Sequence, residues 1–141
     1  MNVLISACLL GVRCRYDGQS KQYHGIEKLI DKYNLIPVCP EIMGGLQTPR
    51  APAERVGNKV LCDSGCDVTV QYQRGAQEVL RLAKLFSCEL AILKANSPSC
   101  SHSKVYDGTF TRTLIDGMGV TAQLLTENGI RVVDETEIFN L

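Results

Sequence analysis

Three cysteines in this chain each come shortly after a short apolar run, at positions far apart in the sequence. Cys8 lies in "ISACLLG", Cys39 ends "NLIPVC", and Cys100 lies in the loop that follows "ELAILKA". If the three runs are parallel strands of one sheet, the loops after them meet at the same edge. Thiolates from separate loops suit a soft metal centre. The pattern therefore indicates a metal site at the carboxyl ends of the strands.

The spacing of these cysteines leaves the identity of the metal open. A zinc ion held by Cys8, Cys39 and Cys100 would take a fourth ligand from water, His24 or His102. A cubane iron–sulfur cluster held by three cysteines would keep one iron open for a substrate. Neither cysteine run typical of ferredoxins is present in the chain. Zinc and an iron–sulfur cluster both remain candidates.

Four further cysteines are placed less informatively. The odd total of seven, with no export signal at the N-terminus, argues against a disulfide scaffold. Cys14 could reach the same edge as Cys8. Cys62 and Cys66 could form half of a zinc site, but no second pair completes it, and we expect buried or surface thiols there. Cys88 is expected to be a packing residue.

Polar residues close to these cysteines could supply catalytic groups. Glu41 comes two residues after Cys39, and burial could raise its pKa toward that of a useful base. It could equally cap a helix or a turn. Ser97, Ser99 and Ser101 flank Cys100, although serine-rich loops usually satisfy their own backbone.

Basic side chains near the same loops could hold a phosphate or another anionic group, or could be solvated loop charges. They are Arg13, Arg15, Arg50, Arg55 and Lys94. A Tyr-Asp-Gly triplet occurs twice, at 16–18 and 106–108, and we expect two turns that frame a pocket. The chain contains no Walker loop, no dinucleotide-binding fingerprint and no His-Glu-x-x-His motif.

Strands and helices alternate along the chain and would position these residues. The apolar patterns predict strands at 2–6, 34–39, 89–95 and 130–134, and helices at 25–33, 68–86 and 119–129. The long helix should begin at a cap formed by Asp67 and bury Val68, Tyr72, Val79, Leu82 and Leu85. Segment 40–66 is expected to be irregular, with a small hairpin turned at Gly57-Asn58.

This alternation predicts the α/β class, with a single three-layer domain over residues 1–141. Its sheet should be mainly parallel and flanked by helices, in a Rossmann-like arrangement. Fifteen Lys and Arg balance fifteen Asp and Glu, so no global field attracts nucleic acid or an anionic membrane. With no signal peptide and no apolar stretch near the roughly 20 residues of a membrane span, we expect a cytoplasmic protein. The sequence leaves the oligomeric state undetermined.

Four segments of the chain together resemble the bacterial thiouracil desulfidase (TudS-like) family, which was long known only as a domain of unknown function. They are "SACLLGVRCRYDG", "PVCPEIMGGLQTPR", "SPSCSHSKVYDGTF" and "GVTAQLLTENGI". The resemblance covers nearly the whole chain. Members of the family commonly have Gly after the last cysteine, where this chain has Ser101 and then His102. We expect that departure to affect pocket shape or substrate choice.

The resemblance implies a [4Fe-4S] cluster held by only three cysteines, and removal of sulfur from a thiolated uracil-type base or nucleotide. Cys8, Cys39 and Cys100 match the ligand positions. Glu41 matches an acidic catalytic residue and Ser97 a supporting serine. We expect Glu41 to activate a water molecule that attacks the thiocarbonyl carbon, with release of sulfide and no net electron transfer. The expected partner is a small thiolated pyrimidine, with no nucleic acid and no membrane.

Substrate contacts are expected from basic and hydroxyl side chains of the same loops, namely Arg13, Arg15, Ser99 and Ser101. Two other classes of protein remain as alternatives. A non-catalytic zinc or iron–sulfur module would use the three cysteines for stability alone. A thiol-redox protein would join Cys8 and Cys14 in a disulfide and bind no iron.

Overall fold

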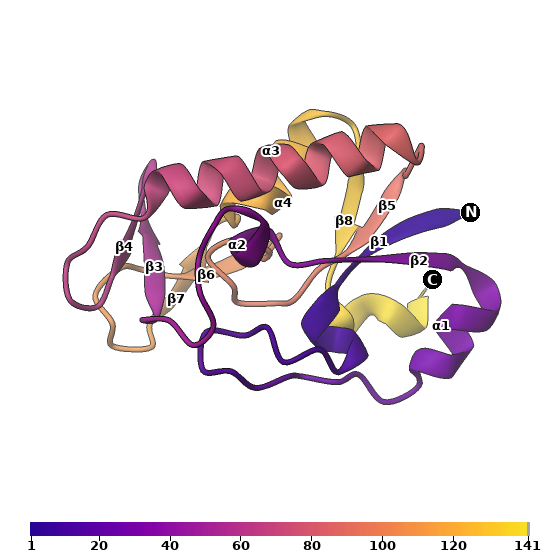
Figure 1. Cartoon of the computed structure of the whole chain (residues 1–141), viewed down its shortest axis with the longest axis horizontal. Coiled ribbons are helices and arrows are strands. Elements are labelled where there is room, and N and C mark those ends of the chain that lie inside the picture. The colour runs from indigo at the N-terminus through magenta and orange to yellow at the C-terminus, as the bar shows by residue number, and fades with distance from the viewer. Residues whose placement is uncertain (141) are drawn as a thin grey trace.

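A four-stranded parallel sheet forms the centre of the protein (Figure 1). The computed structural model describes residues 1–140, and the strand order in this sheet is β2-β1-β5-β8. The strands are β1 (Asn2–Ser6), β2 (Asn34–Val38), β5 (Leu90–Ile92) and β8 (Arg131–Val133). Pro37 is tolerated because β2 is an edge strand. The predicted parallel α/β architecture is confirmed.

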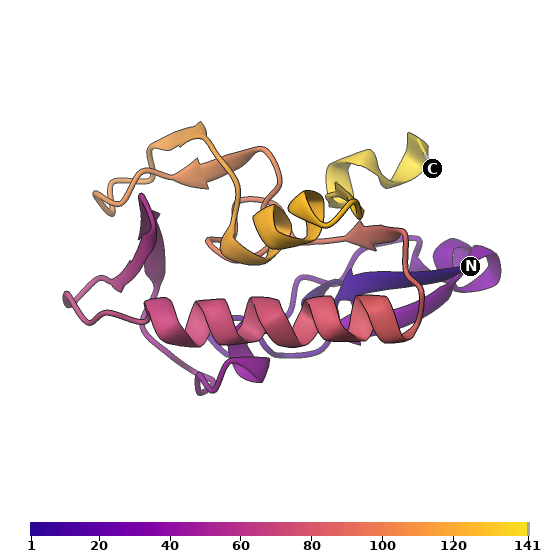
Figure 2. The same ribbon diagram turned by 90° about the horizontal axis from the view of Figure 1, so that it is seen from above.

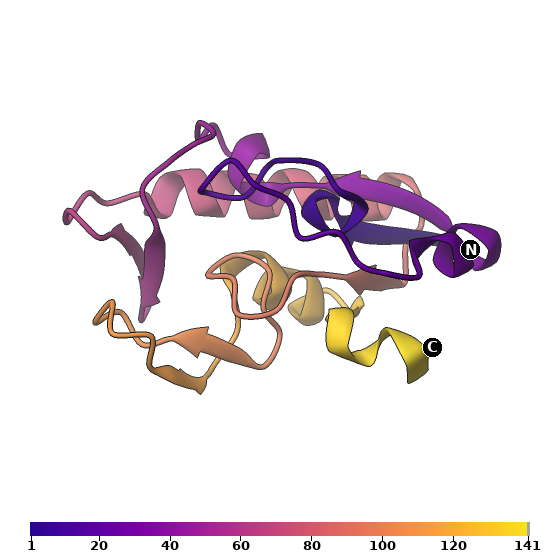
Figure 3. The same cartoon turned by 90° about the horizontal axis from the view of Figure 1, so that it is seen from below.

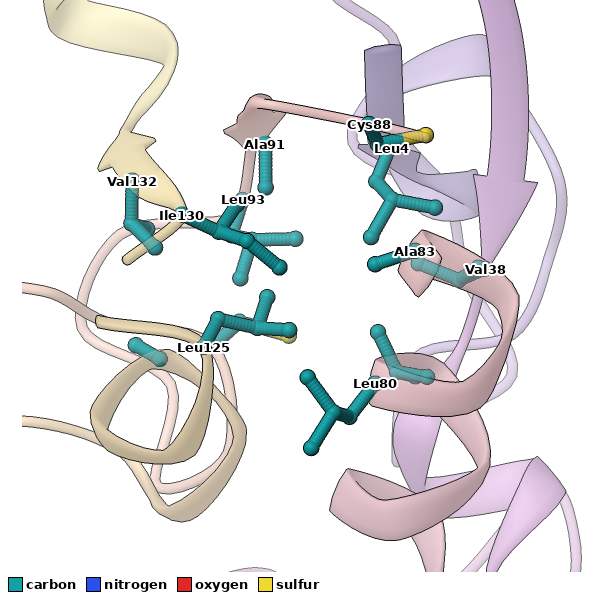
Figure 4. Close-up of a cluster of buried hydrophobic side chains, with 13 residues drawn as sticks. Leu4, Val38, Leu80, Ala83, Cys88, Ala91, Leu93, Leu125, Ile130 and Val132 are labelled. Atoms are coloured by element: carbon teal, nitrogen blue, oxygen red, sulfur yellow. The ribbon is translucent and has the colours of Figure 1, made fainter. Parts of the chain in front are cut away.

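Helices cover both faces of this sheet (Figures 2 and 3). One face carries α3 (Thr69–Leu85) and α4 (Val120–Glu127), and the other carries α1 (Ile26–Lys32) and the 3₁₀ helices η1 (Ala7–Leu10) and η2 (Glu135–Asn140). Side chains alternate along a strand, so Leu4 packs towards α3 and α4 (Figure 4), whereas Ile5 packs with α1 and η2. Each face therefore has its own hydrophobic core.

The buried stripe of α3 differs from the predicted one. Tyr72 and Val79 are buried as expected, but Leu85 is 71% exposed. The stripe continues from Val79 to Ala83, and Leu85 lies two residues further, about 200° around the helix axis. Small residues such as Ala83 form part of the buried stripe, and a prediction based on large apolar residues does not include them. None of the helices described between residues 1 and 140 has the length and apolar character to cross a membrane.

Two antiparallel hairpins lie side by side at one end of the molecule, beside the start of α3 (Figure 1). The hairpin of β3 (Ala53–Val56) and β4 (Lys59–Cys62) turns at Gly57-Asn58, as predicted. The hairpin of β6 (Lys104–Tyr106) and β7 (Leu114–Asp116) was not predicted, because β6 buries only Val105 and β7 is exposed throughout, so neither strand lies in a buried apolar run. Close contact between the two hairpins requires a glycine at 108, because a Cβ atom there would lie 2.5 Å from Val56.

A short helix, α2 (Pro40–Met43), occupies part of the segment that was expected to be irregular. It packs directly against α3, backbone to backbone. A Cβ atom at Gly75 would lie 1.8 Å from the carbonyl oxygen of Pro40, and one at Gly44 would lie 1.9 Å from that of Gln71. Because α2 follows Cys39 and carries Glu41, these two glycines determine where both side chains lie.

Gly75→Ala should destabilise the protein by about 1–3 kcal/mol through overpacking of this contact. A loss of stability would be informative, because alanine is otherwise favoured over glycine inside a helix by about 1 kcal/mol. Urea unfolding followed by circular dichroism would measure the loss. Arg81→Ala is the control on the exposed side of α3, where the Arg81 side chain is 79% exposed. A Gly75→Ala protein as stable as the wild type would contradict the contact.

Candidate functional site

A cavity of about 680 Å³ opens at the carboxyl ends of β1, β2 and β5. Its volume is within the usual range for small-molecule sites. Figure 3 shows the N-terminal segment that contains η1 and the long loop that leads from β5 to β6 on either side of this region. The cavity wall includes four thiols, those of Cys8, Cys14, Cys39 and Cys100. The three cysteines predicted to meet here are therefore brought to one cavity.

Each of the three predicted ligands lies in the segment that follows a central strand. Cys8 is in η1, which follows β1 without a break, and Cys39 is the residue between β2 and α2. Cys100 lies in the loop after β5 and is 5% exposed. Its backbone amide donates a hydrogen bond to Ser97 Oγ at 3.0 Å. The parallel sheet sets the position of all three.

Cys14 also belongs to this group of thiols, as the sequence allowed. It is 3% exposed, and its thiol hydrogen-bonds those of Cys39 and Cys8. The bond with Cys39 lowers the pKa of Cys14, but Cys8 and burial outweigh that effect and raise the pKa to about 11. Cys8 and Cys14 are both free thiols, so the disulfide that a thiol-redox protein would need is not formed.

Burial and mutual proximity favour the neutral form of these thiols. Burial first, and then the Glu41 carboxylate, raise the pKa of Cys100 to about 12. The hydrogen bond with Cys14, followed by burial, raises the pKa of Cys39. Closely spaced thiolates repel one another, and a cation that binds them offsets the repulsion while releasing their protons. The donor set is therefore suited to a positively charged, sulfur-preferring group.

Glu41 forms a buried ion pair with Arg50 on the cavity wall. Arg50 Nε and Nη2 both donate to Glu41 Oε2, at 3.0 and 2.7 Å, and the side chain of Arg50 is only 8% exposed and that of Glu41 14%. Nη2 also donates to the carbonyl oxygen of Cys14 at 2.9 Å, and Nη1 to that of Gln47 at 3.1 Å. Arg50 was considered as a phosphate ligand, but its donors are used to position Glu41 and the loop of Cys14.

The second oxygen of Glu41 is less constrained. Ser97 Oγ lies 3.5 Å from Glu41 Oε1, and the same Oγ accepts hydrogen bonds from the amides of Ser99 and Cys100. Tyr72 is 2% exposed, and burial first, then the Glu41 charge, raise its pKa. Tyr72 was expected only as a core residue of its helix. Glu41 lines the cavity, and its Oε1 is held only by the long hydrogen bond from Ser97, so it has capacity to accept a proton.

Three of the residues predicted to contact substrate lie elsewhere. Ser99 is fully buried and its hydroxyl bonds that of Thr121 at 2.8 Å. Ser101 is 1% exposed and its hydroxyl donates to the carbonyl oxygen of Lys104. Arg13 is exposed to solvent outside the cavity wall. Both serines instead satisfy polar groups within the protein, which corrects the expectation, and of the substrate set only Arg15 lines the cavity.

The remaining basic residues near the site have separate roles. Lys94 pairs with Glu135 at 2.9 Å, which offsets its charge. Arg55 points away from the cavity, towards the carbonyl oxygens of Met118 and Gly57. Three cations on the cavity wall form no ion pair with any residue that the structure describes, and these are Arg15, Lys21 and Arg112. The cavity therefore keeps a cationic rim.

The start of η2 fastens the loop that carries Cys100. Glu135 accepts a hydrogen bond from the Ala95 amide at 2.7 Å, before Cys100 in the chain. After Cys100, His102 Nε2 bonds Glu137 and lies 3.4 Å from Asp134 Oδ2. His102, considered as a zinc ligand, is therefore turned towards these carboxylates, and neither it nor the exposed His24 lines the cavity.

Two cysteines that were expected to be free thiols are bonded to each other. Cys62 and Cys66 form a disulfide next to the cavity residue Asp63. Cys66 is only four residues beyond Cys62, and this spacing also suited half of a zinc site. Cys88 is 5% exposed and packs in the core between α3 and the sheet (Figure 4), as predicted.

The far wall of the cavity comes from the two hairpins and was largely missed by sequence reasoning. It contributes Glu54 from β3, Tyr106 from β6 and Phe110 from the turn that follows. The repeated Tyr-Asp-Gly triplet was the available signal, since Tyr16 and Tyr106 both line the cavity and the aspartate after each accepts a local amide. No pattern distinguished Glu54 from an ordinary surface strand residue.

Known proteins share this sequence and this arrangement. The family model of 2-thiouracil desulfurase matches residues 3–137. The uncharacterized protein YbbK of Bacillus subtilis (strain 168) is 42% identical over 146 residues, which cover 96% of this chain and 97% of the relative. A solved structure described as the [4Fe-4S]-dependent thiouracil desulfidase TudS is 42% identical, with a TM-score of 0.94 over 99% of this chain and 94% of that one. The chain therefore belongs to the 2-thiouracil desulfurase family.

Proposed function

We propose that the protein is a [4Fe-4S]-dependent desulfidase that hydrolyses the thiocarbonyl group of a thiolated uracil. Water supplies the oxygen of the new carbonyl group, and the sulfur leaves as hydrogen sulfide, so no external electrons are needed. One observation carries the proposal: thiols from three separate loops share a cavity with a carboxylate whose Oε2 binds Arg50 and whose Oε1 has only a long hydrogen bond, 3.5 Å, from Ser97. Family membership and the likeness to TudS support it.

Cys8, Cys39 and Cys100 would hold the cluster. The soft thiol donors, their convergence on one cavity and the Ser97 hydroxyl that fixes the backbone amide of Cys100 are all compatible with such a group. The chemistry that a bound cluster supplies here is that of a Lewis acid with affinity for sulfur. Cys14, the fourth thiol, is proposed to remain outside the ligand set.

Glu41 and Ser97 would handle the protons. Glu41 Oε1 accepts a proton from water as the C–O bond forms, because Arg50 occupies only Oε2. Ser97 Oγ, held by two backbone amides, lies 3.5 Å from Oε1 and can pass a proton between Glu41 and the leaving sulfur. Arg50 is a positioning residue, since it orients the carboxylate without facing the reacting atoms.

The open cavity favours this proposal over a non-catalytic metal module. Structural metal sites are closed by protein ligands, whereas catalytic sites keep a position open. Here the thiols line a cavity of about 680 Å³ together with charged and aromatic side chains that metal binding does not need. These groups have the chemistry of a substrate site.

The cationic rim favours a phosphorylated substrate over the free base. Arg15, Lys21 and Arg112 line the cavity without a carboxylate partner among residues 1–140. A neutral pyrimidine would use none of these charges, whereas a phosphate would pair with them. A thiolated uridine monophosphate is therefore the proposed substrate form.

Serine substitution of Cys8, Cys39 or Cys100 should abolish cluster binding, whereas Cys14→Ser should retain it. Anaerobic reconstitution with iron and sulfide, followed by iron analysis, should give about four irons per chain in the wild type. Sulfide release from thiouracil is measured on the same samples. Cys88→Ala is the control for loss of a buried cysteine. Full iron content in Cys100→Ser, or its loss in Cys14→Ser, would contradict the ligand set, and iron without sulfide release would contradict the proposed function.

Glu41→Gln should lower kcat by about 10² to 10⁴, the usual contribution of a general base. Glutamine keeps the shape and an oxygen for Arg50, so iron content and the midpoint of thermal unfolding should stay close to those of the wild type. Glu127→Gln, a carboxylate outside the cavity, is the matched control. Normal turnover in Glu41→Gln with an intact cluster would rule out Glu41 as the base.

Arg15→Gln should reduce kcat/KM roughly tenfold for a thiolated uridine monophosphate and leave it unchanged for the free base. Added salt should weaken the nucleotide reaction in the wild type and have little effect in the variant, since exposed charges are screened. Steady-state sulfide release at two ionic strengths measures both effects. Equal kcat/KM values for base and nucleotide in the wild type would exclude the phosphate site.

A further inference from the structure

Glu54 is a buried carboxylate on the cavity wall that takes no part in metal binding or in the activation of water described above. The residue is 8% exposed and lies in β3. Its Oε1 accepts hydrogen bonds from the backbone amides of Gly108 at 2.9 Å and Phe110 at 3.1 Å. These two bonds join the hairpins to each other and hold the carboxylate in one orientation.

The second oxygen of Glu54 is left for a ligand. Oε2 accepts no hydrogen bond, and no ion pair is formed by Glu54 with any residue that the structure describes. Among those residues, no buried side-chain nitrogen or oxygen lacks a hydrogen-bond partner. Oε2 must therefore be reachable by solvent, and Glu54 is a residue of the cavity wall. A carboxylate that is so nearly buried gains strongly from one further donor.

The neighbours of Glu54 indicate what that donor belongs to. Tyr106 and Phe110 line the same cavity, and aromatic side chains suit the binding of a flat heteroaromatic molecule. A uracil ring carries an N–H group at position 3, between carbons 2 and 4. This N–H group is adjacent to the thiocarbonyl carbon in both thio isomers, and it stays available when N1 carries a ribose.

We infer that Glu54 is a specificity-determining residue that accepts a hydrogen bond from the N3–H group of the thiolated base. The inference rests on the proposed function and adds how the base is recognised. A carboxylate fixed on the wall accepts from N–H and repels a ring nitrogen that carries only a lone pair. With this bond formed, the thiocarbonyl group next to N3 is held in one orientation within the cavity. A base methylated at N3 should be rejected, because the acceptor would be left unpaired.

Glu54→Gln is the decisive variant, because it separates recognition from the anchoring of the hairpins. The amide oxygen of glutamine can still accept from Gly108 and Phe110, whereas its NH₂ group would replace Oε2 and face the N–H of the base. For the reconstituted holoenzyme with thiouracil, KM should rise roughly 10- to 100-fold while kcat changes less than about threefold. The preference for thiouracil over its N3-methyl derivative should largely disappear.

The unfolding temperature and the iron content of Glu54→Gln should match those of the wild type. Glu54→Ala also removes the hydrogen bonds with Gly108 and Phe110, so it measures how much these bonds contribute to stability. If Glu54→Gln keeps wild-type KM and wild-type discrimination while Glu54→Ala is unstable, Glu54 is only an anchor and the inference is overturned. A wild-type holoenzyme that discriminates between the two bases but is unchanged by the substitution also overturns it. A holoenzyme that releases no sulfide from thiouracil overturns the proposed function itself.

Discussion

The common direction of the four central strands is the constraint on which the rest of the site depends. Because β2, β1 and β5 are adjacent and parallel, the residues that follow them emerge at one edge, with neighbouring strands about 4.8 Å apart. Cys39, Cys8 and Cys100 are thereby assembled from three distant parts of the chain. An antiparallel neighbour would place one of these loops at the opposite edge. The long crossover connections that parallel strands require also supply the helices of both layers.

The charged side chains in the cavity contribute more to the positions of the site residues than to the stability of the fold. A buried ion pair such as Glu41–Arg50 gains little net stability, because both groups lose hydration. Arg50 instead reaches three parts of the chain at once: Glu41 on α2, the loop of Cys14, and its own loop at Gln47. The carboxylate of Glu41 and the backbone of Cys14 are thus held by one rigid guanidinium. The contact of α2 with α3 at Gly44 and Gly75 fixes the same region from the other side.

The sheet and the positions of its cysteines could be predicted from the sequence because they depend on local patterns. Apolar runs identified all four central strands, and the rule for parallel sheets then brought Cys8, Cys39 and Cys100 together. Side-chain orientation could not be inferred in the same way. Ser99 and Ser101 flank Cys100 in the chain, but their hydroxyls satisfy internal partners, which depends on contacts with Thr121 and Lys104.

The elements that were missed are those whose stability comes from tertiary contacts. The central strands β5 and β8 are equally short but lie within buried apolar runs, whereas β6 has one buried residue and β7 has none, so their pattern did not indicate strands. The importance of Gly75 and the role of Glu54 follow from neighbours far away in the sequence. One consequence concerns how such a protein can diversify. The sheet positions the three cysteines, whereas another part of the cavity wall belongs to two small hairpins with their own strand pairing (Figure 1). Substitutions in the hairpins can therefore change the shape and polarity of the cavity while the sheet that positions the three cysteines stays the same.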